Sequence, residues 1–222
     1  MGSSNWERLL KFRCTGCGNC CKKTYICVTD ADVNRLVEGT GKPADEIVRF
    51  AKEDEIHLNK RHPWWVRFAN RRGVMVLRWK RGRCQFLAAD NRCTVYAHRP
   101  IVCRLHPYNV TLTHDDWGGI EKLSLSHLTE CPHEWDGDET KKNLGLLERL
   151  LWRDSNRYIP LVEAWNKRKP GEKVGRRTPA AFLASLFGRA ATAEKTAKSV
   201  PRTLAKPGPG PTAWVSEQIA GD

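Results

Sequence analysis

The feature that most constrains this chain is the string CTGCGNCCKKTYIC, Cys14 to Cys27, which holds five of the nine cysteines in 222 residues. Its first part follows the spacing C-x2-C-x2-C-C, and the residues between the cysteines are threonine, asparagine and two glycines. Such small, turn-permissive residues let a backbone wrap around an ion while several sulfurs converge on it. The string therefore predicts a metal-binding loop.

A disulfide framework explains the same cysteines less well. Nine is an odd number, and a disulfide between the neighbours Cys20 and Cys21 would close a strained ring. The chain starts without the apolar segment of a secretory signal and contains no run of 18 apolar residues, so the expected location is cytoplasmic, with no membrane span. In that reducing compartment a dense cysteine pattern is more typical of metal or catalytic sites.

Two short helices are expected after the cysteine string. Thr29, with an acidic residue three positions later, predicts a capped helix that ends at Gly39 or Gly41. Pro43 followed by acidic and then apolar residues predicts a second short amphipathic helix within residues 43–56.

The next part of the chain changes to β-forming residues. Residues 66–96 predict two or three short antiparallel strands, with Cys84 and Cys93 on either side of a tight connection. A single helical turn is expected between Pro100 and Pro107, and the alternation in residues 120–125 predicts another strand. A leucine stripe that starts after an aspartate cap predicts a longer helix over about 138–158, ending before Pro160, and the apolar group LVEAW predicts another turn or two after it.

We therefore expect an α+β fold: a small metal-stabilised domain of residues 1–166, with short antiparallel strands and flanking helices. Residues 167–222 are expected to be a flexible, disordered basic tail rich in proline and alanine, with one short helix near 179–198. This tail holds 11 Lys and Arg against 4 Asp and Glu, so it supplies +7 of the net charge of +13. Positive charge is thus weak evidence that the folded part binds nucleic acid.

The cysteine string and the later segment CQFLAADNRCTVYAHRPIVCRLHPY together resemble the YkgJ-like cysteine-cluster family, also named CxxCxxCC and described as a zinc- or iron-chelating domain. The resemblance covers about residues 12–135. It implies that eight cysteines form the metal site: Cys14, Cys17, Cys20, Cys21, Cys84, Cys93, Cys103 and Cys131. Cys27 lies outside this set. Flagellin lysine N-methylases look related because they share the cysteine cluster.

The identity of the metal stays open between iron and zinc. Three cysteines at two-residue spacing are typical of a 4Fe-4S cluster, in which a distant cysteine supplies the fourth ligand, and Cys131 followed by Pro132 resembles such a ligand. Zinc sites more often combine two separate pairs of cysteines. The spacing therefore leans towards iron-sulfur.

Histidine and arginine side chains near the cysteines are further candidates. A histidine could replace a thiolate, although a lone histidine is more often structural; the four near the cysteines are His98, His106, His127 and His133. Arg99 and Arg104 flank Cys103, where they could neutralise a thiolate-rich site or a bound anion, or pair with an acid such as Asp90.

Three functions remain open at this point. The first is a metal-binding protein whose cysteines chelate iron, as a 4Fe-4S cluster, or zinc. The second is a cluster-dependent enzyme that modifies a protein substrate, similar to the flagellin lysine N-methylases; no catalytic residue is identified for it. The third is a zinc-stabilised module that binds a protein or nucleic acid, in which Trp64 and Trp65 could stack on bases, although tryptophans more often fill a core. Nucleic-acid binding through the basic tail is not favoured.

Overall fold

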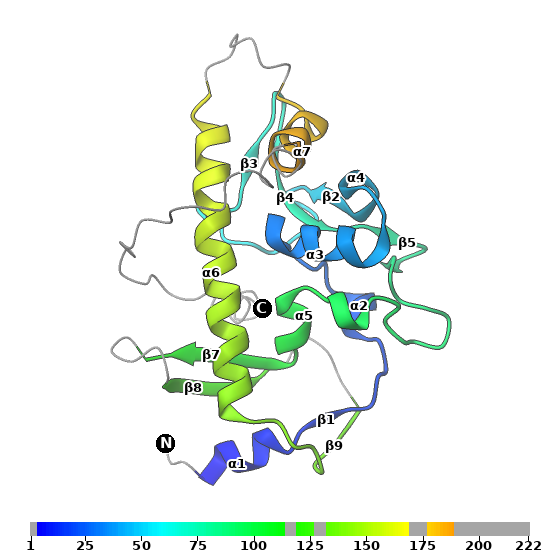
Figure 1. Ribbon diagram of the computed structural model, residues 1–222, viewed down its shortest axis with the longest axis vertical. Helices are drawn as coiled ribbons and strands as arrows, with labels where there is room; N and C mark the ends of the chain where they lie inside the picture. The colour runs from blue at the N-terminus through cyan, green and yellow to red at the C-terminus, as the bar shows by residue number, and fades with distance from the viewer. Residues whose placement is uncertain (1–3, 114–118, 127–131, 169–176, 189–222) are drawn as a thin grey trace.

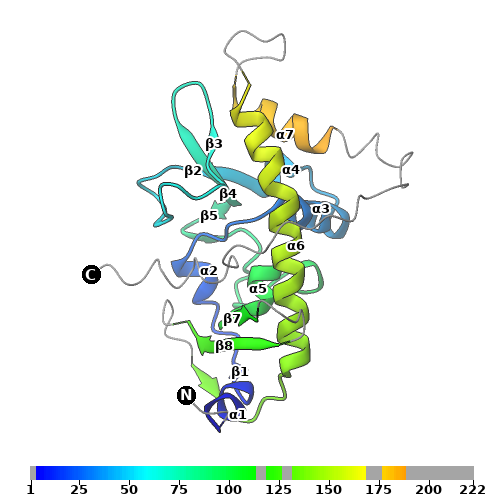
Figure 2. The same cartoon turned by 90° about the vertical axis from the view of Figure 1, so that its left-hand side faces the viewer.

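The long helix α6 (Lys141–Asn166) runs along most of the molecule, and two groups of elements pack against it (Figures 1 and 2). This computed structural model describes residues 4–113, 119–126, 132–168 and 177–188. In Figure 1 a three-stranded sheet lies beside one half of α6 and a hairpin beside the other half. Among the described candidate metal residues, Cys17, Cys20, Cys21, Cys84 and Cys93 lie on segments between these two groups, and Cys14 and Cys103 lie on elements of the hairpin group.

The first group, at the top of Figure 1, is built on a small antiparallel sheet of strand order β2-β4-β3. Its elements are β2 (Val48–Ala51), β3 (Val66–Arg67), β4 (Arg72–Leu77), α3 (Asp30–Thr40), α4 (Ala44–Ile47) and α7 (Pro179–Phe187). Strand β4 is buried along nearly its whole length, because β2 and β3 pair with its two halves. The largest hydrophobic core lies here.

The second group is built on the hairpin β7-β8, at the bottom of Figure 1. Its elements are α1 (Ser4–Leu10), β1 (Arg13–Cys14), α5 (Ile101–Leu105), β7 (Tyr108–Leu112), β8 (Ile120–Leu125) and β9 (His133–Glu134). Between the groups lie α2 (Cys20–Lys23), β5 (Trp79–Lys80), β6 (Arg83–Cys84) and the short 3-10 helix η1 (Tyr96–His98). A second hydrophobic core joins this hairpin to the first half of α6.

Several sequence expectations are confirmed. The fold is α+β with short antiparallel strands. Helix α3 begins after a capping box, in which Asp32 N donates to the Thr29 hydroxyl and Thr29 N donates to the Asp32 carboxylate. It ends at Gly41, whose left-handed conformation, with φ of +66°, suits a residue without a side chain. Helix α5 follows Pro100 as expected.

Two expected helix boundaries are wrong. The helix expected within residues 43–56 stops at Ile47, because residues 48–51 pair with β4 and bury three of their four side chains in the sheet. Helix α6 does not end before Pro160 but continues to Asn166, and Thr140, not an aspartate, caps its start. Buried side chains on both sides of the proline, such as Tyr158 and Val162, hold the helix together there.

The short helix expected near residues 179–198 is present as α7, over residues 179–187, but it packs into the first core and is not part of a flexible tail. Helix α7 starts after the cap Thr178 and buries Phe182 and Leu183 in the first core. The Phe182 ring packs on Trp165 of α6 with a centroid separation of 5.2 Å. The rest of the predicted tail, residues 189–222, lies outside the described residues. Among the residues that are described, no helix is both long and apolar enough to cross a membrane.

Candidate metal centre

The loop between β1 and α2 owes its shape to two glycines. Gly16 and Gly18 have φ of +75° and +73°, a conformation that other residues adopt at a cost. Gly16 N donates to the Cys14 sulfur at 3.4 Å. The chain then enters α2, whose first two residues are Cys20 and Cys21, so the adjacent pair lies at a helix start.

The second cysteine-bearing segment is the turn after β6. Cys84 ends this strand and is buried, and Leu87 forms an isolated antiparallel bridge with Cys93. A Cβ added to Gly18 would lie only 3.1 Å from a Leu87 methyl group and 3.3 Å from Asn91 Cβ. The loop of the first cysteines therefore packs directly on the turn that carries Cys84 and Cys93.

The third segment is α5, which carries Cys103. Its first N–H, at Ile101, donates to Asp32 Oδ1 at 3.0 Å, so the capping residue of α3 also holds the start of α5. Asp32 is buried and also accepts from Arg35 at 2.5 Å. Arg35 in turn donates to Asp154 of α6. This network fixes α5 against α3 and α6.

The three segments bring five thiols together, which we call the thiol cluster: Cys20, Cys21, Cys84, Cys93 and Cys103. The sulfurs of Cys20 and Cys21 are 3.9 Å apart, and the Cys21 thiol also hydrogen-bonds to Cys84. Cys93 interacts electrostatically with Cys21 and Cys84, and Cys103 with Cys20, Cys21 and Cys84.

The pKa shifts of these thiols show how crowded they are. The hydrogen bond to Cys21 and burial raise the pKa of Cys20. For Cys21 the hydrogen bond from Cys20 lowers the pKa, but the hydrogen bond to Cys84 and burial outweigh it and raise the pKa to about 12. The pKa of Cys84 is lowered because it accepts from Cys21. These directions fit a donor order from Cys20 to Cys21 to Cys84, while burial raises the pKa of Cys103.

The other cysteines lie elsewhere. Cys14 is exposed on β1, and Cys17 makes no hydrogen bond or electrostatic contact with another described cysteine. Cys27 forms a bridge with Val76 against the first core, and burial raises its pKa to about 12. Cys131 lies outside the described residues. Within the described part of the chain, no three His, Cys, Asp or Glu side chains are already arranged as a metal site.

Comparison with known proteins decides the family. The family named CxxCxxCC, whose description reads "Putative zinc- or iron-chelating domain", matches residues 13–132, which is more than half of the chain. The chain belongs to this family. Its membership supports metal chelation in general, without deciding between zinc and iron.

A curated relative gives no further information on function. An uncharacterized protein of Methanocaldococcus jannaschii is 32% identical over 116 residues, which cover 49% of this chain and 54% of that protein. The chain thus spans about half the length of that relative. No solved structure gives a significant match.

The donor set of the CxxCxxCC domain fits its description. Five sulfurs from three segments form the thiol cluster, and neutral thiols this close would repel one another if several ionised without a cation. A bound zinc or iron ion would favour the ionised thiolates instead, because the thiolate is the form of cysteine that binds the metal. The thiol cluster would hold such a metal, and Cys14 lines a cavity together with the cluster residues Cys20 and Cys103.

Three of the four candidate histidines lie within the described residues. His98 packs its ring on the backbone of Gly39, and His133 stacks on Phe12 with a centroid separation of 5.1 Å. Burial lowers the pKa of His106, which lines a cavity next to the cysteines. His127 lies outside the described residues.

The candidate arginines do not pair with Asp90, which instead lies 3.8 Å from Arg92. Arg99 and Arg104 line a cavity of about 600 Å³ that also touches Cys14, Cys20 and Cys103. We call it the cysteine-side cavity. No sequence pattern pointed to it, because its wall combines β1, α5, η1 and the start of α6.

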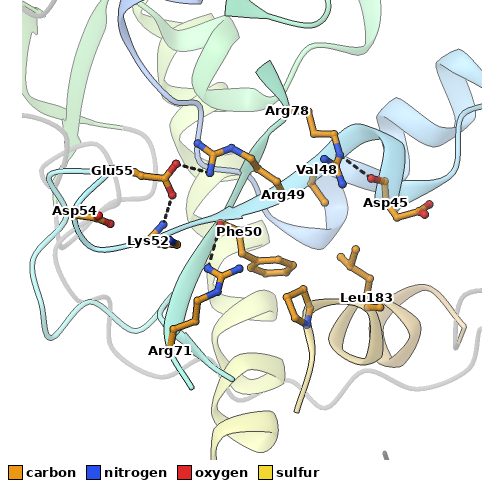
Figure 3. Close-up of a pocket in the computed structure, with 12 residues that line it drawn as sticks. Asp45, Val48, Arg49, Phe50, Lys52, Asp54, Glu55, Arg71, Arg78 and Leu183 are labelled. Carbon is orange, nitrogen blue, oxygen red and sulfur yellow. Dashed lines mark hydrogen bonds and ion pairs between the residues drawn. The ribbon is translucent and has the colours of Figure 1, made fainter. Parts of the chain in front are cut away.

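A second cavity, of about 730 Å³, lies between β2, β4 and α7 and contains no cysteine (Figure 3). Its arginines are engaged with neighbouring groups: Arg49 pairs with Glu55 at 2.8 Å, Arg71 donates to the carbonyl of Phe50, and Arg78 donates to that of Asp45. This cavity is therefore no candidate for the metal.

The tryptophans expected in the core are found there. Trp64 and Trp65 are 6% and 4% exposed, and the Trp64 ring packs on Tyr158 of α6. Trp65 Nε1 donates to the carbonyl of Asn59 at 2.9 Å. Buried rings cannot stack on a nucleic acid, so the prediction of a core role is confirmed for this pair.

Proposed function

We propose that this chain is a metal-chelating protein whose thiol cluster holds iron or zinc. The observation that supports it most is the run of sulfur contacts from Cys20 through Cys21 to Cys84, which joins segments more than 60 positions apart. Inert core cysteines do not need to meet in this way. Here Cys84 belongs to the first hydrophobic core, while Cys21 and Cys93 are only partly buried against it.

The pure sulfur donor set suits both metals. Four thiolates bind zinc as a closed structural site, and the same number holds a 4Fe-4S cluster. The spacing of Cys14, Cys17 and Cys20 favours the iron-sulfur cluster, whereas the thiol cluster alone can supply four ligands for zinc. Either group would join three segments that are distant in sequence, and its binding free energy would add to folding stability.

The test starts with anaerobic purification, followed by elemental analysis, sulfide determination and a visible spectrum. Iron with sulfide and a broad visible absorption identifies a cluster, and one or two colourless zinc ions per chain identify a zinc site. A folded, thermally stable chain that carries neither metal and does not take up either contradicts the proposal.

Matched variants place the metal on the thiol cluster. Cys21→Ser should lower both the metal content and the melting temperature, because Cys21 contacts the most other thiols. Cys27→Ala is the control, since Cys27 packs against the core away from the cluster and should keep full metal content. Equal metal loss in both variants, or in neither, would refute the assignment.

A further inference from the structure

The cysteine-side cavity combines three cysteines with two unusually placed arginines. Cys20 and Cys103 of the thiol cluster face it, together with Cys14 of β1. Arg99 and Arg104 belong to the same wall, one before and one within α5. The cavity therefore places positive charge directly beside the proposed metal centre.

Both guanidinium groups are anchored on the backbone of η1. Arg99 Nε donates to the carbonyl of Tyr96 at 3.3 Å, and its guanidinium lies 3.7 Å from the centre of the Tyr96 ring. Arg104 donates to the next carbonyl, that of Ala97, at 2.5 Å. Adjacent carbonyls thus hold the two groups near each other. Each guanidinium has five N–H donors, and each of these contacts occupies one of them.

Of the other charged groups that line the cavity, Asp138 is exposed, and Arg13 and Glu139 have partners. Arg13 is bound to Asp136 and Glu134 at 2.7 and 3.0 Å. The Glu139 carboxylate accepts from its neighbour's N–H and from Asn143 Nδ2. Within the described residues, neither Arg99 nor Arg104 forms an ion pair with a carboxylate, and both are only half-exposed. Two anchored cations without an acidic partner are the donors that an oxyanion needs.

We propose that the cysteine-side cavity binds a small molecule through a carboxylate or phosphate group held by Arg99 and Arg104. Its volume of about 600 Å³ is in the range of metabolite-sized ligand sites and exceeds what a bare anion needs. Phe12, Tyr108 and Leu147 offer an apolar wall for the remainder of the ligand. The inference rests on the proposed function for one point, that the thiols beside this anion hold a metal.

The test uses the full chain with its metal content measured in every sample. Sodium phosphate and sodium succinate are titrated separately by calorimetry at constant ionic strength. We expect saturable binding of at least one probe, and at least tenfold weaker binding in both Arg99→Gln and Arg104→Gln. Arg92→Gln is the matched control, because Arg92 is exposed, pairs with Asp90 and does not line the cavity. It should bind like the unchanged protein.

The outcomes separate the two proposals. Saturable binding of phosphate but not succinate identifies a phosphate ligand, and the reverse identifies a carboxylate. Absence of saturable binding at full metal content overturns the anion site and leaves the metal proposal intact. Equal weakening in Arg92→Gln also overturns it, since that result indicates nonspecific attraction. Binding that depends on Arg99 and Arg104 in a chain that neither carries nor takes up zinc or iron overturns only the proposed function.

Discussion

Replacing Gly18 by alanine tests whether the cysteine loop must dock on the turn that carries Cys84 and Cys93. Gly16→Ala is a matched control, because both glycines have nearly the same left-handed φ, and a new Cβ at Gly16 meets nothing within 4 Å. The shared backbone cost is about 1–2 kcal/mol. Only Gly18→Ala adds contacts, at 3.1 and 3.3 Å from Leu87 methyl groups and 3.3 Å from Asn91.

These extra contacts set the size of the expected effect. Forcing one methyl group into a packed contact costs about 1–3 kcal/mol. If docking brings thiols together for the metal, that cost appears in metal affinity, where 1.4 kcal/mol corresponds to tenfold. Gly18→Ala should therefore bind metal roughly 5- to 150-fold more weakly than Gly16→Ala.

The assay is competition against a chelator of known affinity, followed by the metal's spectrum or by a fluorescent indicator. Melting temperatures of the metal-free variants are measured in parallel, so that a general loss of folding is recognised. Equal metal affinities for Gly16→Ala and Gly18→Ala would refute the reasoning, because they would show that the metal does not require the loop to pack on Leu87.

Three further predictions concern stability. His62 Nδ1 accepts a hydrogen bond from Trp64 N, and burial lowers the pKa of His62 to about 4. The contribution of His62 to the free energy of unfolding should therefore be complete above pH 6.5, and up to roughly 3 kcal/mol of it should be lost as the pH falls through 4. In urea titrations, His62→Gln should reduce this dependence of stability on pH. Phe182→Ala should lower the free energy of unfolding by about 3–5 kcal/mol in chemical denaturation, because Phe182 is fully buried. Ala184→Ser, on the exposed side of α7, should change this free energy little. Equal effects of the two substitutions would contradict the packing of α7 in the core. Removing the metal with a chelator should lower the melting temperature of the unchanged protein, and an unaltered melting curve would argue against a structural contribution of the metal.

Local signals predicted the local structure well. The capping box at Thr29, the left-handed stop at Gly41 and the proline start of α5 each depend on residues within a few positions. The errors arose where distant packing decides. Pro160 remains inside α6 because residues on both sides of it bury the same face. The short helix at residues 179–187 joins the core, instead of lying in a flexible tail, because Phe182 packs among aromatic side chains from other segments.

The sequence predicted a cysteine metal site, and membership of the family supports metal chelation in general. The resemblance implied eight cysteine ligands, and five of these cysteines form the thiol cluster. The dense first motif suggested that Cys14 and Cys17 would lie together with Cys20. Cys14 lines a cavity with Cys20 and Cys103, whereas Cys17 has no hydrogen bond to another described thiol. Spacing in sequence does not fix which way a loop turns.

The buried network around Asp32 explains why these cysteines and the fold depend on each other. Asp32 caps α3, accepts from the first N–H of α5 at Ile101 and binds Arg35, which reaches Asp154 on α6. Cys103 lies two residues after Ile101 in α5. The Asp32 carboxylate therefore connects the position of this cluster thiol to helices α3 and α6. Removing the charge of Asp32 would leave Arg35 with one carboxylate partner fewer and the first N–H of α5 without its acceptor. This should destabilise the fold strongly, because Asp32 is buried and a buried polar group without a hydrogen-bond partner is costly. We therefore expect metal affinity and the packing of α3 on α6 to be thermodynamically coupled through this residue.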